Sequence, residues 1–240
     1  MIHDDFGEIS FLKKNNIKYL SVRILPDSLQ VNLPTGVSQE DGMIFIEKNR
    51  EKILKKQQKQ CENVNSALLL SPEKMLHTLT FGVRIVASER NSVAFALRNK
   101  VLTIEFPKEK DISTAKMQKT FWHGIEHFLR KEAKRVLPAR LKELADLHGF
   151  TFHKVTIKSS KGRWGSCACH KKGDPQPTFS INLSFYLLLT TAQLVDYVLL
   201  HELCHTREMN HSPRFWQEMD RVTNGQSKML RSELKNYKLP

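Results

Sequence analysis

Hydrophobic and polar side chains alternate along much of the N-terminal part of the chain. Residues 19–25 and 28–33 both alternate with a period of two, and Pro26-Asp27 lies between them. Because the side chains of a strand point alternately to its two faces, this pattern predicts two strands joined as a hairpin. Further short strands are predicted near residues 76–86, 92–97 and 101–106.

One helix is expected among these strands. Pro34-Thr35-Gly36 interrupts the second strand of the hairpin, and Ser38 with Asp41 has the spacing of a helix cap and its partner. Apolar residues then recur at helical spacing to about Gln60, which predicts a helix over this stretch. The region before residue 110 is therefore expected to be β-rich with a single helix.

Helical periodicity begins again at Ser113. An apolar stripe extends toward Val136-Leu137, and Pro138 is expected to start a second helix that ends near Gly149. The stripe is formed by Phe121, Trp122, Ile125, Phe128 and Leu129.

Short strands and a buried helix follow. Strands are predicted at residues 155–159, 163–170 and 178–182, with turn-forming residues at 171–175, and the apolar run 192–200 predicts a buried helix. The patterns together predict an α+β fold with a mixed sheet in its second part. We place a boundary near residue 110, between an N-terminal β-rich region (1–110) and a second domain (111–240). We find no internal sequence repeat.

The motif His201-Glu202-Leu203-Cys204-His205 follows directly on the apolar run. Residues four apart share one face of a helix, so His201 and His205 can bind the same metal ion. Glu202 lies beside that face and can accept a proton from water at the metal. Two imidazoles and a carboxylate in an apolar helix are unfavourable unless a metal satisfies them, which favours a zinc site over a chance occurrence.

A third imidazole, His211, follows six residues later. Asn210 tolerates the left-handed backbone conformation and is expected to turn the chain back toward the metal. Ser212-Pro213 has the form of the cap and first turn of a new helix. Three histidines leave one coordination position for water or substrate, so we expect one catalytic Zn²⁺ per chain.

Composition bears on where such a protein acts. No apolar run is long enough to cross a bilayer, and the acidic start lacks the layout of a secretory signal. The four cysteines form no disulfide framework. We therefore expect a cytoplasmic protein with no membrane partner. Cys167 and Cys169 point to one face of a strand and His170 to the other, which argues against a second metal site.

The net charge of +13 is concentrated after residue 110, where 21 basic side chains stand against 12 acidic ones. Such an excess can bind phosphate backbones or acidic proteins. The alternative is a solvated basic face without a partner, because no nucleic-acid recognition motif accompanies the charge. The candidate nucleic-acid contacts are Lys154, Lys158, Lys161, Lys171 and Lys172.

Several motifs in a fixed order closely resemble the YgjP-like metallopeptidase family, which is related to the SprT-like and WLM-type zinc peptidases. They are Lys161-Gly162-Arg163-Trp164-Gly165-Ser166-Cys167, Ile181-Asn182-Leu183, the HELCH motif, Asn210-His211-Ser212 and Phe215-Trp216. The N-terminal strand pair also fits, so the resemblance covers most of the chain. It implies a zincin-like catalytic domain in which His201, His205 and His211 ligate zinc and Glu202 is the general base.

The stretch Arg163-Trp164-Gly165-Ser166 is a signature of that family, and the sequence leaves its role open. Arg163 could anchor a substrate carboxylate or backbone, or it could join Trp164 in packing the sheet against the active-site helix; packing is favoured because large aromatics are usually buried. Asn182 could line the cleft or close a strand turn. Arg163 and Asn182 are therefore the candidate substrate-binding residues. Candidate donors to an oxyanion are Tyr197, Arg163 and Tyr237.

The expected function is that of a zinc metallopeptidase, a hydrolase acting on protein or peptide substrates. One alternative is a nucleic-acid-associated zinc protease that acts on DNA-bound proteins, which the basic cluster motivates. Another is a non-catalytic zinc-binding interaction module. It is disfavoured because structural zinc sites normally use four protein ligands.

Overall fold

The computed structural model describes residues 2–3, 5–25, 28–56, 69–170 and 177–237. Its contacts divide the chain into two compact units, unit 1 (residues 1–69) and unit 2 (residues 70–240). The boundary predicted near residue 110 does not coincide with this division, because the strands between 70 and 110 share a core with the helix that follows them. In the described ranges no helix is long and apolar enough to span a membrane.

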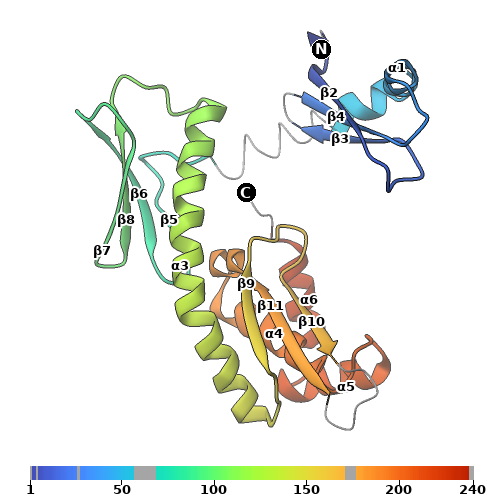
Figure 1. The fold of residues 1–240 in the computed structure, drawn as a ribbon. Helices are drawn as coiled ribbons and strands as arrows, with labels where there is room; N and C mark the ends of the chain where they lie inside the picture. Colours follow the sequence, from blue (N-terminus) through green and yellow to red (C-terminus); the bar gives the residue numbers. More distant parts are fainter. Residues whose placement is uncertain (1, 4, 26–27, 57–68, 171–176, 238–240) are drawn as a thin grey trace. The chain divides into compact units, whose positions relative to one another are not determined.

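Unit 1 is a four-stranded sheet with a helix (Figure 1). The predicted hairpin is present as β3 and β4, while β1 and β2 were not predicted. Buried side chains of β2, β4 and the helix form the core of this unit, together with Phe6 and Ile53. The elements are β1 (Ile2–His3), β2 (Gly7–Lys13), β3 (Ser21–Leu25), β4 (Ser28–Leu33) and α1 (Gln39–Lys48).

The cap of α1 forms as predicted. The Ser38 side chain accepts a hydrogen bond from the Asp41 amide, and the Asp41 carboxylate accepts one from the Ser38 amide, so the helix start is closed from both sides. The helix ends at Asn49, and residues 50–56 are helical again. The rest of the stretch predicted to be helical, to about Gln60, lies outside the described residues.

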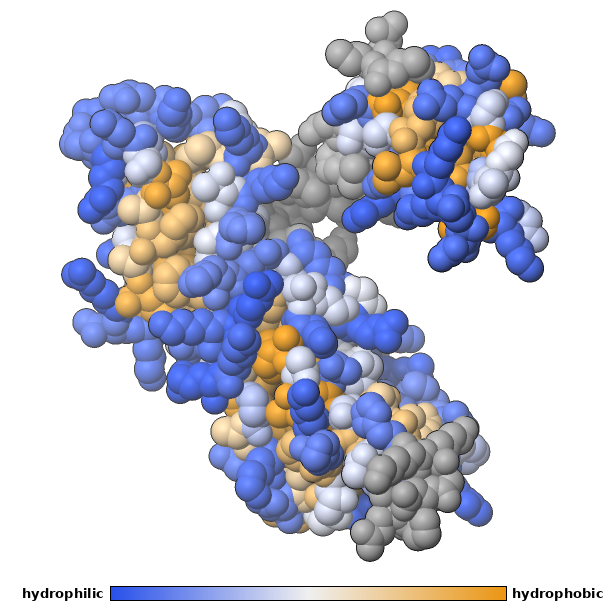
Figure 2. All heavy atoms as spheres, in the orientation of Figure 1, coloured by the Kyte–Doolittle hydropathy of each residue, from blue (hydrophilic) through white to orange (hydrophobic). Residues whose placement is uncertain are grey.

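Unit 2 begins with a second four-stranded sheet packed on a long helix, α3 (Figure 1). Phe106 of the sheet contacts Phe121 of the helix with ring centroids 6.1 Å apart. Figure 2 shows apolar side chains over this sheet, next to the hydrophilic outer face of α3. The elements are β5 (Leu76–His77), β6 (Gly82–Ser88), β7 (Ala94–Arg98), β8 (Val101–Pro107) and α3 (Ala115–His148).

The sheets of the two units repeat one topology. The strand orders are β1-β2-β4-β3 and β5-β6-β8-β7, and in each sheet the central pair is parallel while the hairpin is antiparallel. The sequence shows no repeat because alternation and turn positions recur, whereas residue identities do not. In the β7–β8 hairpin, Asn99 and Lys100 form the two-residue turn with positive φ of 49° and 61°.

The structure has one helix, α3, where the sequence predicted two. Pro138 lies inside it and removes one backbone hydrogen bond, at a cost of about 3 kcal/mol. The apolar stripe nevertheless keeps the same phase on both sides of the proline, and its burial outweighs the lost bond. The helix ends at Gly149 as predicted, with a left-handed φ of 67°. The buried residues around the proline are Leu129, Ala133, Leu137, Leu141 and Leu144.

A three-stranded mixed sheet, one 3₁₀ helix and three further α-helices complete the described part of unit 2. Strand β11 is central, antiparallel to β10 and parallel to β9, and its Ile181 and Leu183 are fully buried. The turn predicted at 171–175 lies outside the described residues. The elements are β9 (Lys154–Lys158), β10 (Gly165–His170), β11 (Thr178–Ser184), the 3₁₀ helix η1 (Phe185–Leu189), α4 (Ala192–Cys204), α5 (Pro213–Val222) and α6 (Ser227–Lys235).

Candidate metal centre

Helix α4 carries the first two histidines. Its start is capped by the Thr191 side chain, which accepts a hydrogen bond from the Leu194 amide, and most of its residues are buried in the core of unit 2. His201 and His205 lie one turn apart at its C-terminal end with ring centroids 4.9 Å apart. The helix therefore holds both imidazoles on one face, as the spacing predicted.

The chain bends at Met209 and Asn210, but Asn210 does not adopt the left-handed conformation that the sequence predicted. Helix α4 ends with His205 in a right-handed conformation. The change of direction begins just after the helix, where the amides of Arg207 and Glu208 both donate to the Cys204 carbonyl at 3.0 Å. These bonds close the helix end without a left-handed residue.

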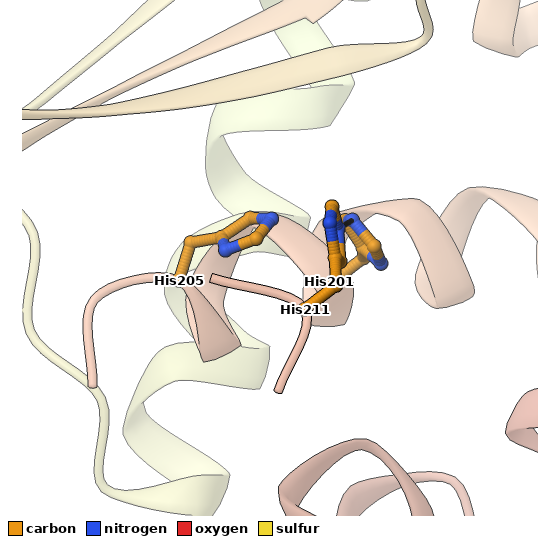
Figure 3. Close-up of side chains that lie close together, drawn as sticks. All are labelled: His201, His205 and His211. Carbon is orange, nitrogen blue, oxygen red and sulfur yellow. Dashed lines mark hydrogen bonds between the residues drawn. The ribbon is translucent and has the colours of Figure 1, made fainter. Parts of the chain in front are cut away.

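His211 completes the cluster from the loop that follows. All three imidazoles point toward one another, and one nitrogen from each lies within 4.8 Å of the others (Figure 3). The Nε2 atoms of His201 and His211 are 3.1 Å apart. Two nitrogens bound to one tetrahedral zinc ion at about 2.0–2.1 Å lie about 3.3 Å apart, so this spacing fits a shared ion. Ser212 caps α5 and Pro213 is its first residue, as predicted.

Burial favours the neutral, metal-binding form of the two imidazoles on α4. Burial and the neighbouring imidazoles of His205 and His211 lower the pKa of His201 to about 3, and burial lowers the pKa of His205. The Nδ1 atom of His205 lies 3.1 Å from the Glu208 carbonyl. A carbonyl can only accept a hydrogen bond, so Nδ1 carries the proton and Nε2 is left with a free lone pair.

Phe215 forms an apolar floor under the three imidazoles. Its fully buried ring has its centroid 4.9 Å from His201, 4.6 Å from His205 and 4.8 Å from His211. Trp216 stacks on His211 at 5.9 Å. Sequence reasoning gave Phe215 no role at the site, since its contact with the ligands depends on how α5 packs against α4.

Glu202 lies next to the histidines with its carboxylate buried; only 5% of the residue is exposed. Within the described part of the chain its Oε2 has no hydrogen-bond partner, and neither does the buried Nδ1 of His201. Burial raises the pKa of Glu202 to about 8, and the positive charge of Arg163 acts in the opposite direction. A buried carboxylate oxygen without a partner is unfavourable, so Oε2 of Glu202 fits a site completed by water beside a cation.

Gly165 at the start of β10 lies against the Glu202 carboxylate. A Cβ atom at this position would be 2.6 Å from Oε1 and 2.7 Å from Cγ of Glu202. Only glycine therefore allows the strand to approach the carboxylate so closely. The sequence favoured packing of Arg163 and Trp164 against the HELCH helix, but it did not predict that Gly165 meets the Glu202 carboxylate, because that contact joins residues far apart in the chain.

Arg207 fastens the loop between the second and third histidines. Its guanidinium donates to the carbonyls of His148 and Gly149 at 3.3 and 2.6 Å, where α3 ends. It also lies 4.3 Å from the centroid of the Phe150 ring and forms an ion pair with Glu218 of α5. The loop that positions His211 is therefore tied to two helices.

The two residues expected to bind substrate, Arg163 and Asn182, line the same hollow at one end of the three-stranded sheet. Arg163 is exposed, and its charge acts on Glu202, whereas Trp164 packs against the core. Asn182 pairs with Ser166 across the sheet and donates to its hydroxyl at 3.3 Å. The neighbours of Asn182 in β11, Ile181 and Leu183, are buried toward the helices, so by alternation Asn182 points to the other face.

Two of the candidate oxyanion donors differ in burial. Tyr197 is buried with its ring centroid 6.2 Å from that of His201, and burial raises its pKa. Tyr237 is half-buried and packs on the core. Neither arrangement selects the donor, so its identity stays a prediction.

The basic residues proposed to bind nucleic acid are only partly described. Lys154 and Lys158 are exposed at the two ends of β9, which is an edge strand. Lys161 lies 3.5 Å from the Glu126 carboxylate and 5.4 Å from the centroid of the Tyr186 ring. Lys171 and Lys172 lie outside the described residues. Nucleic-acid binding therefore stays a prediction from charge.

Comparison with known proteins identifies the family. The YgjP-like metallopeptidase domain matches residues 18–237, which is nearly the whole chain. No curated protein gives a significant match. Among solved structures, the crystal structure of the metallopeptidase zymogen of Pyrococcus abyssi abylysin is 23% identical, covers 43% of this chain and 100% of its own, and gives a TM-score of 0.34. From the family match, the chain belongs to the YgjP-like metallopeptidases and is a metal-dependent hydrolase.

Proposed function

We propose that the protein is a zinc-dependent peptidase that uses Glu202 as its general base. The observation that supports this is the cluster of three imidazole nitrogens within 4.8 Å, beside a buried carboxylate oxygen that has no partner. Three nitrogen ligands suit Zn²⁺ and leave one position for water or substrate. In the described part of the chain the cluster contains no fourth ligand, which argues against a purely structural zinc module.

A zinc ion held by His201, His205 and His211 would supply a Lewis acid that acidifies water and polarises a carbonyl oxygen. Glu202 Oε2, buried and without a partner, accepts a proton from the attacking water and passes it to the nitrogen of the leaving amine. Burial helps this carboxyl group hold the proton, since it raises the pKa of Glu202 to about 8. The positive charge of Arg163 favours the ionised form that first accepts the proton.

Metal content tests the ligand set. We expect about one zinc per chain in the wild-type protein after reconstitution and a clear loss in His211→Ala, because two histidines remain. His123→Ala is the matched control, since His123 is exposed on α3 and lies outside the cluster. Elemental analysis of the three purified proteins gives the answer. Full zinc retention in His211→Ala would contradict the three-histidine site.

Turnover of Glu202→Gln tests the general base. The amide has nearly the shape of the carboxylate but does not accept the proton, so we expect unchanged zinc content and a loss of peptide cleavage of about 10²- to 10⁴-fold. Glu208→Gln is the control, because Glu208 contributes its backbone carbonyl to His205 and that carbonyl is unchanged. Cleavage of a fluorogenic peptide library measures the effect. Near-normal cleavage by Glu202→Gln would reject the assignment.

A further inference from the structure

A hollow of about 380 Å³, here called the basic recess, lies where β9 and β11 end and β10 begins. The register of the sheet brings Lys158 opposite Ser184 and Gly165 opposite Leu183 at this end. Its lining also contains Arg163. Among the described residues that line the recess, none is acidic.

The basic recess begins next to the proposed general base. Gly165 lines it, and the same residue lies so close to Glu202 that a Cβ would be 2.6 Å from Oε1. Arg163, two residues before Gly165, lines it as well. Through Gly165 the recess adjoins the carboxylate proposed to act in cleavage.

Neither cation of the recess lies within ion-pair distance of a carboxylate among the described residues, although the charge of Arg163 acts on Glu202 at longer range. Lys158 and Arg163 are exposed and form no ion pair within that part of the chain. Lys161, which lies between them in sequence, differs because it pairs with Glu126 at 3.5 Å. The charge of Lys158 and Arg163 is thus available to a ligand.

The hydroxyl group of Ser166 gives the basic recess a hydrogen-bond donor beside its two cations. Ser166 Oγ accepts a hydrogen bond from the Asn182 amide at 3.3 Å, which leaves the hydroxyl proton of Ser166 for a ligand. An arginine next to a hydroxyl and a lysine suits a carboxylate, because a guanidinium can donate two parallel hydrogen bonds to its two oxygens. Trp164 packs against the core and fixes the start of the strand that follows Arg163.

We propose that the basic recess binds a carboxylate group of the peptide substrate, with Arg163 as the principal contact and Lys158 as the second. This inference rests on the proposed peptidase function and names the substrate class: peptides with an acidic group close to the cleaved bond. The group is either an Asp or Glu side chain or the C-terminal carboxylate, and both present the same chemistry to Arg163.

Matched peptides test the proposal with the zinc-loaded, full-length protein. One series places Asp or Asn at each position around the cleaved bond of an amidated peptide, and the other compares a free C-terminal acid with its amide. We expect kcat/KM to be about 10- to 100-fold higher for the acidic member of one pair, as for a hydrogen bond between charged groups. The series in which this preference occurs identifies the source of the carboxylate.

Variants locate the preference. Arg163→Gln is expected to bring the ratio of the two kcat/KM values close to one, and Lys158→Gln to reduce it less. Lys154→Gln is the control, since Lys154 is exposed at the other end of β9 and does not line the recess, and it should keep the wild-type ratio. Cleavage of both peptides by the wild-type protein at equal rates would overturn the recess proposal while leaving the peptidase intact.

A binding measurement separates the recess from the chemistry. Trp164 lines the recess, so the indole ¹⁵N–H signal of Trp164 reports on occupancy without turnover. The probes are the α-amides of N-acetylaspartate and N-acetylasparagine, and N-acetylglycine with its amide. A saturable shift with one acidic probe, absent in Arg163→Gln, supports the recess even if no peptide is cleaved and the peptidase proposal fails. No shift, or equal shifts with acidic and neutral probes, overturns it.

Discussion

Gly165 is the residue on which the position of Glu202 depends. In Gly165→Ala the added Cβ would lie less than 3 Å from three atoms of the Glu202 side chain, and that side chain is buried, so the carboxylate must move. A misplacement of about 1 Å can reduce turnover about 10²-fold, and we expect a loss of that order with zinc content unchanged. Peptide cleavage and elemental analysis of the same preparation measure both.

Gly162→Ala is the matched control for this prediction. Gly162 lies three residues earlier in the same stretch, and a Cβ there meets no atom within 4 Å. It should cleave peptides like the wild-type protein. Equal activity of Gly165→Ala and Gly162→Ala would show that the Glu202 carboxylate is not held by its contact with the strand.

The residues of the metal centre divide into those that the sequence predicted and those that it did not. His201, His205 and Glu202 were predicted because helical spacing alone brings them together, and His211 because of the motif that follows. Gly165 and Phe215 contact these side chains from other elements, and no local pattern records a contact of that kind. The prediction of a left-handed conformation at Asn210 was wrong, because backbone hydrogen bonds at the end of α4 already redirect the chain.

At the scale of elements, Arg207 connects the ligand loop with the end of α3 and with α5. In Arg207→Met the hydrogen bonds to the His148 and Gly149 carbonyls and the ion pair with Glu218 are lost, while an unbranched apolar stem is retained. We expect zinc affinity to fall about tenfold, as when groups that orient metal ligands are removed. Competition with a chromogenic chelator measures the affinity.

Arg214→Met provides the comparison for Arg207→Met. Arg214 is exposed near the start of α5, and the substitution removes the same charge from a residue close to His211. If both variants lose zinc affinity equally, then local charge and not the anchoring of the loop is responsible.

Pro138 shows how packing overrides a local signal. In Pro138→Ala a backbone N–H returns to the interior of α3 and the strain of the ring is relieved, at the expense of a more flexible unfolded chain. We expect the free energy of unfolding to rise by about 1–2 kcal/mol. Urea denaturation followed by tryptophan fluorescence measures it.

Lys131→Ala, on an exposed position of the same helix, should change stability by only a few tenths of a kcal/mol. A decrease in Pro138→Ala would mean that contacts of the proline ring outweigh the restored bond.

The strands were largely predictable from the sequence and their partners were not. Alternation identified the hairpin of β3 and β4, since β4 buries every second residue, and the sequence also predicted the strands around β6 to β11. The β2 strand was missed because only Ile9 of its seven residues is buried, so its alternation is weak. The shared topology of the two sheets depends on parallel pairing between strands that are not neighbours in the chain, which a local pattern does not record.

At the scale of the whole molecule, the two units have separate cores, and the candidate metal centre found among the described residues lies in unit 2. All three tryptophans, Trp122, Trp164 and Trp216, belong to unit 2. Tryptophan fluorescence therefore reports the unfolding of unit 2 alone, whereas calorimetry detects both units. This division makes it possible to ask which part of the chain a bound metal stabilises.

We expect zinc to raise the melting temperature of unit 2 and to leave that of unit 1 unchanged. A ligand at 100 times its Kd stabilises the folded state by about 2.7 kcal/mol, which corresponds to about 5–10 °C for a unit of this size. His211→Ala should abolish the shift in the tryptophan signal. A shift that persists in this variant would place the zinc elsewhere in unit 2. A single calorimetric transition that moves as a whole would show that the two units, despite their separate cores, unfold together.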